Sequence, residues 1–271
     1  MSTMPLSALD LALAALLMAV NGAISFGFRL GLERSLAIAA LRMVVQLVLV
    51  GLILKFVFAQ SSILWTALVA LVMLAAAAYE SVSRQERPLA GWGAYALGAG
   101  PPFAAGLFAT FLGVAAIIGA DPWYAPRYLL PVLGMVLGNA LSGVCLVLDA
   151  IGEGLTRERS AIEARLALGA TRYDATGGVL RRALKTGMMP ILTTMTASGL
   201  IALPGMMTGQ ILAGAEPLEA AKYQIMILFL IAGATGLAVA GAGIGAVRAL
   251  TDDRHRLRLD RLQAKRDDTR A

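Results

Sequence analysis

The sequence of 271 residues contains one cysteine, Cys145, and one histidine, His255. A single cysteine cannot form a disulfide within the chain. Since Cys145 lies inside an apolar run, we expect a small buried side chain there. One histidine excludes a metal site built from several imidazoles, and with it a His-based zinc protease. Hydrolysis by a Ser–His pair is excluded for the same reason, because His255 lies in the charged C-terminal stretch.

Charged side chains are also scarce. They make up 15% of the chain, whereas 58% of the residues are hydrophobic and the mean hydropathy is +0.75. Globular domains contain roughly 45–50% apolar residues. The composition therefore predicts an all-α, polytopic membrane protein whose main contact is membrane lipid. The net charge is +6, but no basic run is interleaved with aromatic residues, so we expect no nucleic-acid partner.

Motifs for nucleotide chemistry are missing as well. The chain has no G-x-x-x-x-G-K-[ST] phosphate loop, so it cannot act as a P-loop ATPase. The glycines of 241–245 lack the spacing and the preceding strand of a dinucleotide-binding loop, and they indicate close helix packing instead. We therefore predict a protein that is not an enzyme and that binds no cofactor itself.

Long apolar runs are what the sequence has in place of these features. A helix needs about 20 residues to cross a bilayer. Pro101-Pro102 predicts a kink or a late start in the fourth helix, and Gly134 and Gly138 have the spacing of closely packed membrane helices. The pattern predicts about seven transmembrane helices, at residues 8–28, 36–58, 63–78, 95–119, 129–148, 188–212 and 223–247.

The basic residues predict the orientation, because cytoplasmic segments are enriched in Lys and Arg. We place 149–187 and the C-terminal stretch in the cytoplasm. With seven spans, the arginines that follow the first and third spans are then cytoplasmic as well. Lys55, Arg127 and Lys222 lie on the outer side. We predict a multi-pass protein of the cell (inner) membrane with the N-terminus out and the C-terminus in. Residues 1–250 would form the membrane domain, with a cytoplasmic elbow at 152–186, and 251–271 a charged cytoplasmic tail that is a solvated helix or disordered.

The interior of the chain has one well-patterned polar segment. Ser160 and Glu163 have the spacing of a capping box, which starts a helix. Gly169 can take the left-handed conformation that ends this helix, and Thr171 with Asp174 repeats the box. We therefore predict two short helices that meet at a glycine, a shape that suits a cleft on a partner. An amphipathic helix lying on the membrane is the alternative.

This segment, residues 160–174, contains Glu-Ala and then Leu-Gly-Ala-Thr, and it resembles the cytoplasmic coupling motif of ABC transporter permeases. The resemblance implies that it docks on a separate ATPase subunit, which binds the ATP, and that it transmits the motion of that subunit. Arg165 stands where that family usually has Ala. The coupling residues would be Glu163, Ala164, Leu168, Gly169, Ala170 and Thr171.

Polar and sulfur-bearing residues surround a break at Pro204-Gly205 in the sixth run. Irregular backbone inside a membrane is tolerated where it is buried in protein or lines a cavity, and transporters bind solutes at such breaks. Arg42 either lines this path or extends to the cytoplasmic face. The predicted translocation path comprises Arg42, Gln46, Asn139, Pro204, Gly205, Met206, Met207, Thr208 and Gln210.

The stretch Leu-Pro-Gly-Met-Met-Thr-Gly-Gln-Ile-Leu-Ala-Gly at 203–214 resembles the signature of the FetB family of permeases. Pro-Arg-Tyr-Leu-Leu-Pro at 126–131 and Arg42 with Gln46 resemble the same family, in the same order along the chain. The resemblance implies the membrane subunit of an ABC exporter linked to iron homeostasis, working as a homodimer with two ATPase subunits. Plant relatives of that family are linked to aluminium tolerance, so the resemblance leaves the transported species open.

Two alternatives remain open. One is an ABC permease for a non-metal solute such as a sugar nucleotide, and the other is a non-transporting membrane scaffold for a cytosolic ATPase. The membrane region has few carboxylates, mainly Glu80 and four groups at its boundaries, which are Asp121, Asp149, Glu216 and Glu219. Since a bare iron ion would find little coordination there, no metal ligands are assigned, and a chelated ion or an organic solute fits the sequence as well.

Overall fold

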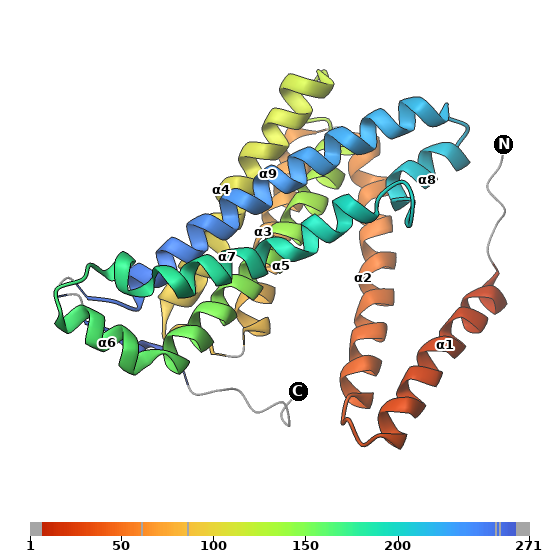
Figure 1. The fold of residues 1–271 in the computed structure, drawn as a ribbon. Helices are drawn as coiled ribbons and strands as arrows, with labels where there is room; N and C mark the ends of the chain where they lie inside the picture. Colours follow the sequence, from red (N-terminus) through yellow and green to blue (C-terminus); the bar gives the residue numbers. More distant parts are fainter. Residues whose placement is uncertain (1–6, 61, 86, 253, 255, 264–271) are drawn as a thin grey trace.

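The computed structural model describes residues 7–60, 62–85, 87–252, 254 and 256–263. Within these residues the regular structure is helical, apart from three isolated β-bridges. The helices are α1 (Ala8–Gly27), α2 (Glu33–Gln60), α3 (Ile63–Arg84), α4 (Trp92–Phe111), the π-helical η1 (Leu112–Ile118), α5 (Pro126–Arg157), α6 (Arg159–Ala167), α7 (Arg172–Ala197), α8 (Gly205–Leu212), α9 (Pro217–Ala249) and the 3₁₀ turn η2 (Leu259–Arg261) (Figure 1).

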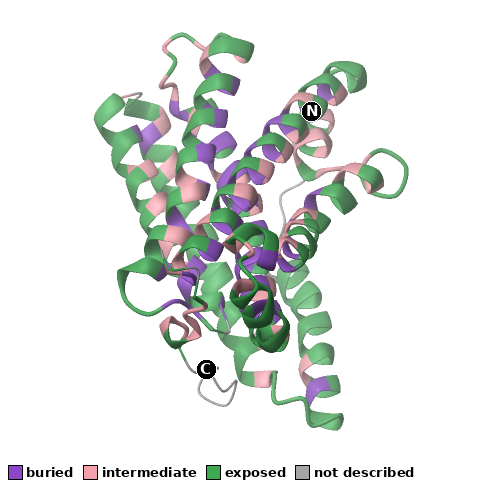
Figure 2. Ribbon diagram, turned by 60° about the vertical axis from the view of Figure 1, so that its left-hand side comes forward, coloured by how far each residue is buried: buried purple, intermediate pink, exposed green. Residues whose placement is uncertain are grey.

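The core is a bundle of α4, α5, α7 and α9, with α3 packed against α4 and α5. Buried residues lie mainly along these helices (Figure 2). On α9 four buried alanines, Ala234, Ala238, Ala242 and Ala246, recur every fourth residue. Residues four apart lie on one face of a helix, and small residues let neighbouring backbones approach closely in membranes. This stripe therefore allows the tight bundle.

A close crossing joins α5 to α7. A Cβ atom built on Gly143 would lie 2.8 Å from the carbonyl oxygen of Gly187 and 2.8 Å from a methyl carbon of Val239. Gly134 and Gly138, whose spacing suits close helix packing, do not form such a backbone crossing within one copy of the chain. A Cβ atom on Gly138 would have no neighbour within 4 Å, and one on Gly134 would meet only the end of a flexible side chain. The spacing of two glycines does not tell which face of the helix meets a neighbour.

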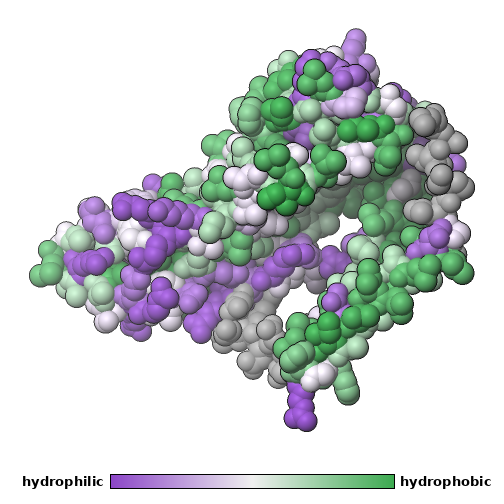
Figure 3. All heavy atoms as spheres, turned by 45° about the vertical axis from the view of Figure 1, so that its right-hand side comes forward, coloured by the Kyte–Doolittle hydropathy of each residue, from purple (hydrophilic) through white to green (hydrophobic). Residues whose placement is uncertain are grey.

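Helices α1 and α2 form an arm that packs chiefly on itself and makes smaller contacts with α3 and α5 (Figure 1). The turn between them is closed by the buried Ser25 hydroxyl. It donates to Glu33 Oε1 at 2.8 Å and accepts the Leu32 N–H at 3.0 Å. The apolar side chains of this arm are almost all exposed (Figures 2 and 3), as suits helices surrounded by lipid.

Six described helical segments are long and apolar enough to cross a membrane: α1, α2, α3, α4 with η1, α5 and α9. They confirm the prediction of an all-α, polytopic membrane protein. The predicted run 188–212 is not one helix, because α7 ends at Ala197 and α8 begins at Gly205. The first half of α7 is rich in arginine, so α7 alone is not an apolar span. A seventh crossing that α7 and α8 make together stays a prediction, as does the orientation.

The start of α4 lies at Trp92, nine residues before Pro101. The alternative of a late helix start is therefore wrong. Both prolines lie inside α4, which continues to Phe111 and passes directly into η1.

The described part of the tail folds back on the loop that joins α3 to α4. The Ala90 N–H donates to the Arg261 carbonyl at 2.8 Å, the Gln263 N–H donates to the Pro88 carbonyl at 3.0 Å, and Leu262 packs on the core. The prediction of a solvated helix or a disordered tail is wrong for 256–263. Residues 253, 255 and 264–271 lie outside the described part, and the division at residue 250 stays a prediction. The described part of the tail, this loop and α6 share one end of the molecule, where hydrophilic atoms gather (Figures 1 and 3).

Candidate coupling and transport site

The predicted elbow exists, and Gly169 is its turning point. Leu168 caps α6 by donating its N–H to the Ala164 carbonyl at 3.1 Å. Gly169 follows with φ +90°, the left-handed conformation that the sequence predicts. Thr171 then caps α7, since its hydroxyl accepts the Asp174 N–H at 3.3 Å and donates to the Asp174 carboxylate at 2.6 Å. The end of one helix and the start of the next are therefore fixed locally by sequence.

The other two predictions about the elbow are wrong. Helix α6 begins at Arg159, its N-cap is Glu158, and Ser160 forms no cap. Glu163 pairs with Arg159 at 2.8 Å instead of closing a capping box. The reason is that α5 continues to Arg157, so that α6 follows it almost without interruption. The second helix is also not short, because α7 extends for 26 residues into the bundle.

The two faces of α6 differ. Ile162 is fully buried and Leu166 packs on the core. Glu163 and Ala164 are exposed on the other face, and Leu168 is 88% exposed at the tip. The apolar face is therefore covered by the protein itself rather than left for lipid. This observation argues against a helix that lies on the membrane, and it leaves Leu168 as an exposed apolar side chain at the tip.

The elbow is tied to both neighbouring helices. Arg182 of α7 forms an ion pair with Glu158, between α5 and α6. Arg165, the residue that departs from the coupling motif, donates to the Ala175 carbonyl of α7 at 3.3 Å. A force on α6 would therefore reach α5 and α7 together.

The predicted break lies at residues 198–204, between α7 and α8. Gly199 has φ +97°, and its N–H donates to the Ala202 carbonyl at 2.9 Å. Leu200 and Ile201 in this turn are 96% and 84% exposed. The irregular backbone is thus not covered within one copy of the chain. Helix α8, with half-buried Met206, Met207, Thr208 and Gln210, packs on α9.

The structure does not gather all the predicted path residues. Arg42 and Gln46 are exposed on α2, and Asn139 is half-buried on α5, where it donates to the Met135 carbonyl of its own helix at 2.8 Å. Only the Pro204–Gln210 part lies at α8. The principal helix contacts of the described residues do not join α8 to α2 or to α5.

Four buried side-chain oxygens lack a hydrogen-bond partner in the described part of the chain. Gln210 Oε1 is in α8, Thr110 Oγ1 in α4, and Gln224 Oε1 and Thr235 Oγ1 in α9. A buried polar atom without a partner requires an explanation, such as water or an ion. The sequence analysis had singled out one of the four, Gln210, because it follows the predicted helix break at Pro204-Gly205. For the other three, the sequence shows only a polar residue within an apolar run, which does not predict an unpaired buried oxygen.

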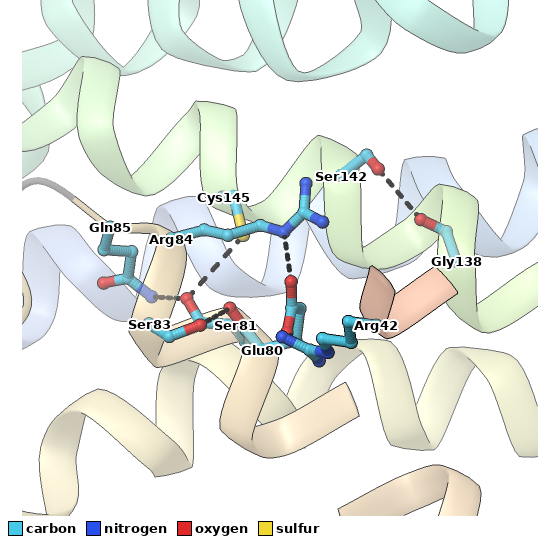
Figure 4. Close-up of polar contacts among 9 residues, drawn as sticks. All are labelled: Arg42, Glu80, Ser81, Ser83, Arg84, Gln85, Gly138, Ser142 and Cys145. Atoms are coloured by element: carbon cyan, nitrogen blue, oxygen red, sulfur yellow. Dashed lines mark hydrogen bonds and ion pairs between the residues drawn. The ribbon is translucent and has the colours of Figure 1, made fainter. Parts of the chain in front are cut away.

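A charged cluster joins α2 to α3. Glu80 accepts from Arg42 Nη2 at 2.8 Å and from Arg84 Nε at 2.9 Å (Figure 4). Ser81 donates to the Gly98 carbonyl of α4 at 2.8 Å, and the buried Cys145 Sγ lies 3.7 Å from the Ser81 carbonyl. Burial of Cys145 confirms its prediction. Arg42 is thus held by a carboxylate, which the sequence did not predict because the two residues are 38 positions apart.

Replacing Glu80 by Gln is expected to leave Arg42 without its counter-ion in a membrane helix. Charged side chains there are costly when unpaired, so we expect a loss of stability of up to about 2.5–3.5 kcal/mol, the insertion cost of a central arginine. Thermal unfolding of the detergent-solubilised protein would measure it. The double variant Arg42→Gln, Glu80→Gln should recover part of the loss. Equal stability of Glu80→Gln and the wild type would contradict this role.

No group of three or more His, Cys, Asp or Glu side chains in the described residues could hold a metal ion. The methionines near the break serve mainly as packing: Met188, Met195 and Met206 pack on the core, while Met189 is exposed.

These features define a helical, multi-pass membrane protein with a helical elbow between α6 and α7. The chain belongs to the family described as "Uncharacterised protein family (UPF0014)", whose model matches residues 8–250. No solved structure matches it significantly.

Three relatives illustrate the family. "Probable iron export permease protein FetB" of Escherichia coli K12 is 30% identical over 94% of this chain and 96% of its own length, which confirms the resemblance seen in the sequence. "UPF0014 membrane protein STAR2" of rice is 36% identical over 82% of this chain and 76% of the relative. "Protein ALUMINUM SENSITIVE 3" of Arabidopsis thaliana is 34% identical over 82% and 79%. The name of the E. coli relative indicates a transport role for that protein rather than catalysis.

Proposed function

We propose that the chain is the membrane permease subunit of an ABC-type exporter in the cell (inner) membrane. A separate ATPase subunit binds the ATP and docks on the elbow. The observation that carries this proposal is the elbow itself: a helix whose apolar face is covered by its own protein, with Leu168 and a left-handed Gly169 exposed at the tip. The name of the E. coli relative supports iron export as the direction and substrate.

The mechanism follows from the ties of the elbow. Closure of the ATPase pushes α6, and the contacts of Glu158 with Arg182 and of Arg165 with Ala175 pass this motion to α5 and α7. Since α7 ends at the break, its tilt moves the turn before Pro204 and opens the path along α8. Such bistable helix shifts are a common form of switching.

The substrate that best suits the path is an iron species that keeps its own ligands. Carbonyl and hydroxyl oxygens on α8, such as the side-chain oxygens of Gln210 and Thr208, can form hydrogen bonds with a chelate or with a hydrated ion. They lack the charge that would replace the full coordination shell of a bare ion. Aluminium species share this preference for oxygen donors.

We also propose that the permease works as a homodimer. Irregular backbone at membrane depth must be buried in protein or line a cavity, whereas Leu200 and Ile201 at the break are almost fully exposed in one copy. A second copy is the occupant that the family resemblance implies. In a Cys145→Ala background, Leu200→Cys is expected to form disulfide-linked dimers in membranes. Leu64→Cys, an exposed position on α3, is the control. Equal cross-linking of both variants would contradict the interface.

The test of the proposed function is transport by the reconstituted complex. Permease and ATPase are placed in vesicles with the ATPase side outward, and ATP-dependent uptake is measured for ferrous and ferric iron, an iron chelate, an aluminium chelate and a sugar nucleotide. Uptake of iron or its chelate supports iron export. Uptake of the sugar nucleotide alone would favour a non-metal solute, and uptake of none, with the ATPase bound, would favour a scaffold.

A further inference from the structure

The second half of α7 lies at membrane depth. A Cβ atom on Gly143 would lie 2.8 Å from the Gly187 carbonyl oxygen, and one on Gly236 would lie 3.8 Å from Met188 Cε. Gly143 and Gly236 are near the middle of α5 and α9, which are both membrane-spanning candidates. The part of α7 from Gly187 onward therefore runs beside the membrane part of the bundle.

This part of α7 is covered on one side only. Ile191 is buried, and Met188 and Met195 pack on the core. The exposed residues here are Met189, Pro190, Leu192, Thr193, Thr194 and Thr196. No residue between Gly187 and Ser198 is charged. One copy of the chain thus leaves a polar but uncharged helix face open at membrane depth.

The hydroxyl groups of this face donate their hydrogens to their own helix. Each of four hydroxyls donates to the carbonyl oxygen four residues earlier, at 2.7–3.1 Å, and they belong to Thr186, Thr194, Thr196 and Ser198. A hydroxyl has one hydrogen and two lone pairs, so these groups present acceptor sites outward. Since Pro190 has no N–H, the Thr186 carbonyl also lacks its helical partner.

The hydroxyl face is continuous with the polar end of the molecule. Thr186 lines an open pocket of about 630 Å³, whose lining on α5 extends from Leu146 to Arg157 and includes charged side chains of both signs. Thr186 is next to Gly187, where α7 crosses α5, so it lies at the inner end of this pocket. At its other end the face reaches Ser198, where the irregular turn before α8 begins.

We propose that this hydroxyl face of α7, from Thr186 to Ser198, lines the translocation path and selects a solute by its hydrogen-bond donors or its positive charge. The inference rests on the proposed function and names the class of substrate. A metal cation that keeps its water ligands presents O–H donors on all sides, and hard cations prefer oxygen ligands. A chelate whose outer groups are N–H or O–H donors fits the face as well.

An anionic solute fits this face poorly. An anion needs hydrogen-bond donors, and each of the four hydroxyls must first break the bond to its own helix to become one. Thr193, which makes no hydrogen bond with a described residue, is the exception on this face. No Lys or Arg between Gly187 and Ser198 supplies a positive charge. The face therefore discriminates against a sugar nucleotide and against an iron chelate of net negative charge.

The first experiment asks whether the face is in contact with water. Thr193→Cys and Phe229→Cys are made in the full chain in a Cys145→Ala background and treated in membranes with a charged thiosulfonate, which reacts with thiols in water. Phe229 is an exposed apolar residue of α9 and serves as the control. We expect faster labelling at residue 193 than at residue 229. Equal rates would overturn the proposal, because the face would then lie against lipid.

The second experiment measures selection in vesicles that contain the permease and the ATPase. ATP-dependent uptake is compared for ferrous iron and for an anionic ferric citrate complex, and the wild type should prefer ferrous iron. The double variant Thr194→Val, Thr196→Val is expected to lower ferrous uptake about tenfold, as two lost hydrogen bonds would. Thr176→Val is the matched control, because the Thr176 hydroxyl makes the same bond within α7 but is buried.

The outcomes separate this inference from the proposed function. Preferential uptake of the ferric citrate complex, or equal ferrous uptake by the double variant and Thr176→Val, would overturn the inference while ATP-driven iron transport stands. No uptake of either iron species by the wild type would count against the proposed function itself, and against the inference with it.

Discussion

Replacing Gly169 by Val is expected to lower ATP-driven transport strongly, while the chain still inserts and the ATPase still hydrolyses ATP. Gly169 has φ +90°, and a Cβ atom there would meet no atom within 4 Å. The effect is therefore conformational strain rather than a clash. A left-handed L-residue costs about 1–2 kcal/mol, and a β-branched residue is the least tolerant. The backbone would relax to a negative φ and redirect α6 relative to α7.

When the direction of α6 relative to α7 has changed, closure of the ATPase no longer moves α5 and α7. We expect transport to fall about tenfold or more, because each 1.4 kcal/mol of strain shifts an equilibrium about tenfold. The matched control is Gly169→Asn, because Asn tolerates the left-handed conformation, and it should retain most of the transport. Transport and ATP hydrolysis measured in the same vesicles decide the question. Wild-type transport in Gly169→Val would disprove the coupling mechanism.

Replacing Gly143 by Val is expected to have the largest effect on stability. Its Cβ would lie 2.8 Å from the Gly187 carbonyl oxygen, a backbone atom that cannot turn away as a flexible side chain can, and equally close to Val239. Overpacked cores lose typically about 1–3 kcal/mol, and we expect the upper part of this range because α5 and α7 must separate. Thermal unfolding in detergent would show this loss as a midpoint lower by several degrees.

Gly138→Val is the control on the same helix, because a Cβ atom at Gly138 has no neighbour within 4 Å. Both variants introduce the same β-branched residue into α5, so the difference between them isolates the crossing. If the two variants unfold at the same temperature, the close contact between α5 and α7 does not limit the size of the side chain at residue 143.

Features set by local chemistry could be predicted from the sequence. The first and last apolar runs match α1 and α9 closely, because a long hydrophobic run needs no tertiary information. Gly169 and Thr171 end one helix and start the next as predicted, since their cap bonds are made within a few residues.

Features set by packing could not be predicted. Ser160 fits a capping box, but α5 extends to Arg157 and α6 begins at Arg159, so Glu158 stands at the N-cap position and Ser160 lies inside the helix. Gly134 faces a side chain of α3 and Gly138 faces no neighbour within one copy, while the backbone crossing with α7 lies at Gly143. The pairing of Arg42 with Glu80 depends on how α2 meets α3, which the pattern of either helix does not contain.

The most direct test of the account is the accessibility of the elbow tip. Leu168, 88% exposed, is replaced by Cys in a Cys145→Ala background, and a membrane-impermeant maleimide is applied from either side, with and without the ATPase subunit. The account predicts labelling from the cytoplasmic side alone and protection once the ATPase is bound. Labelling from the outer side, or unchanged labelling in the presence of the ATPase, would contradict it.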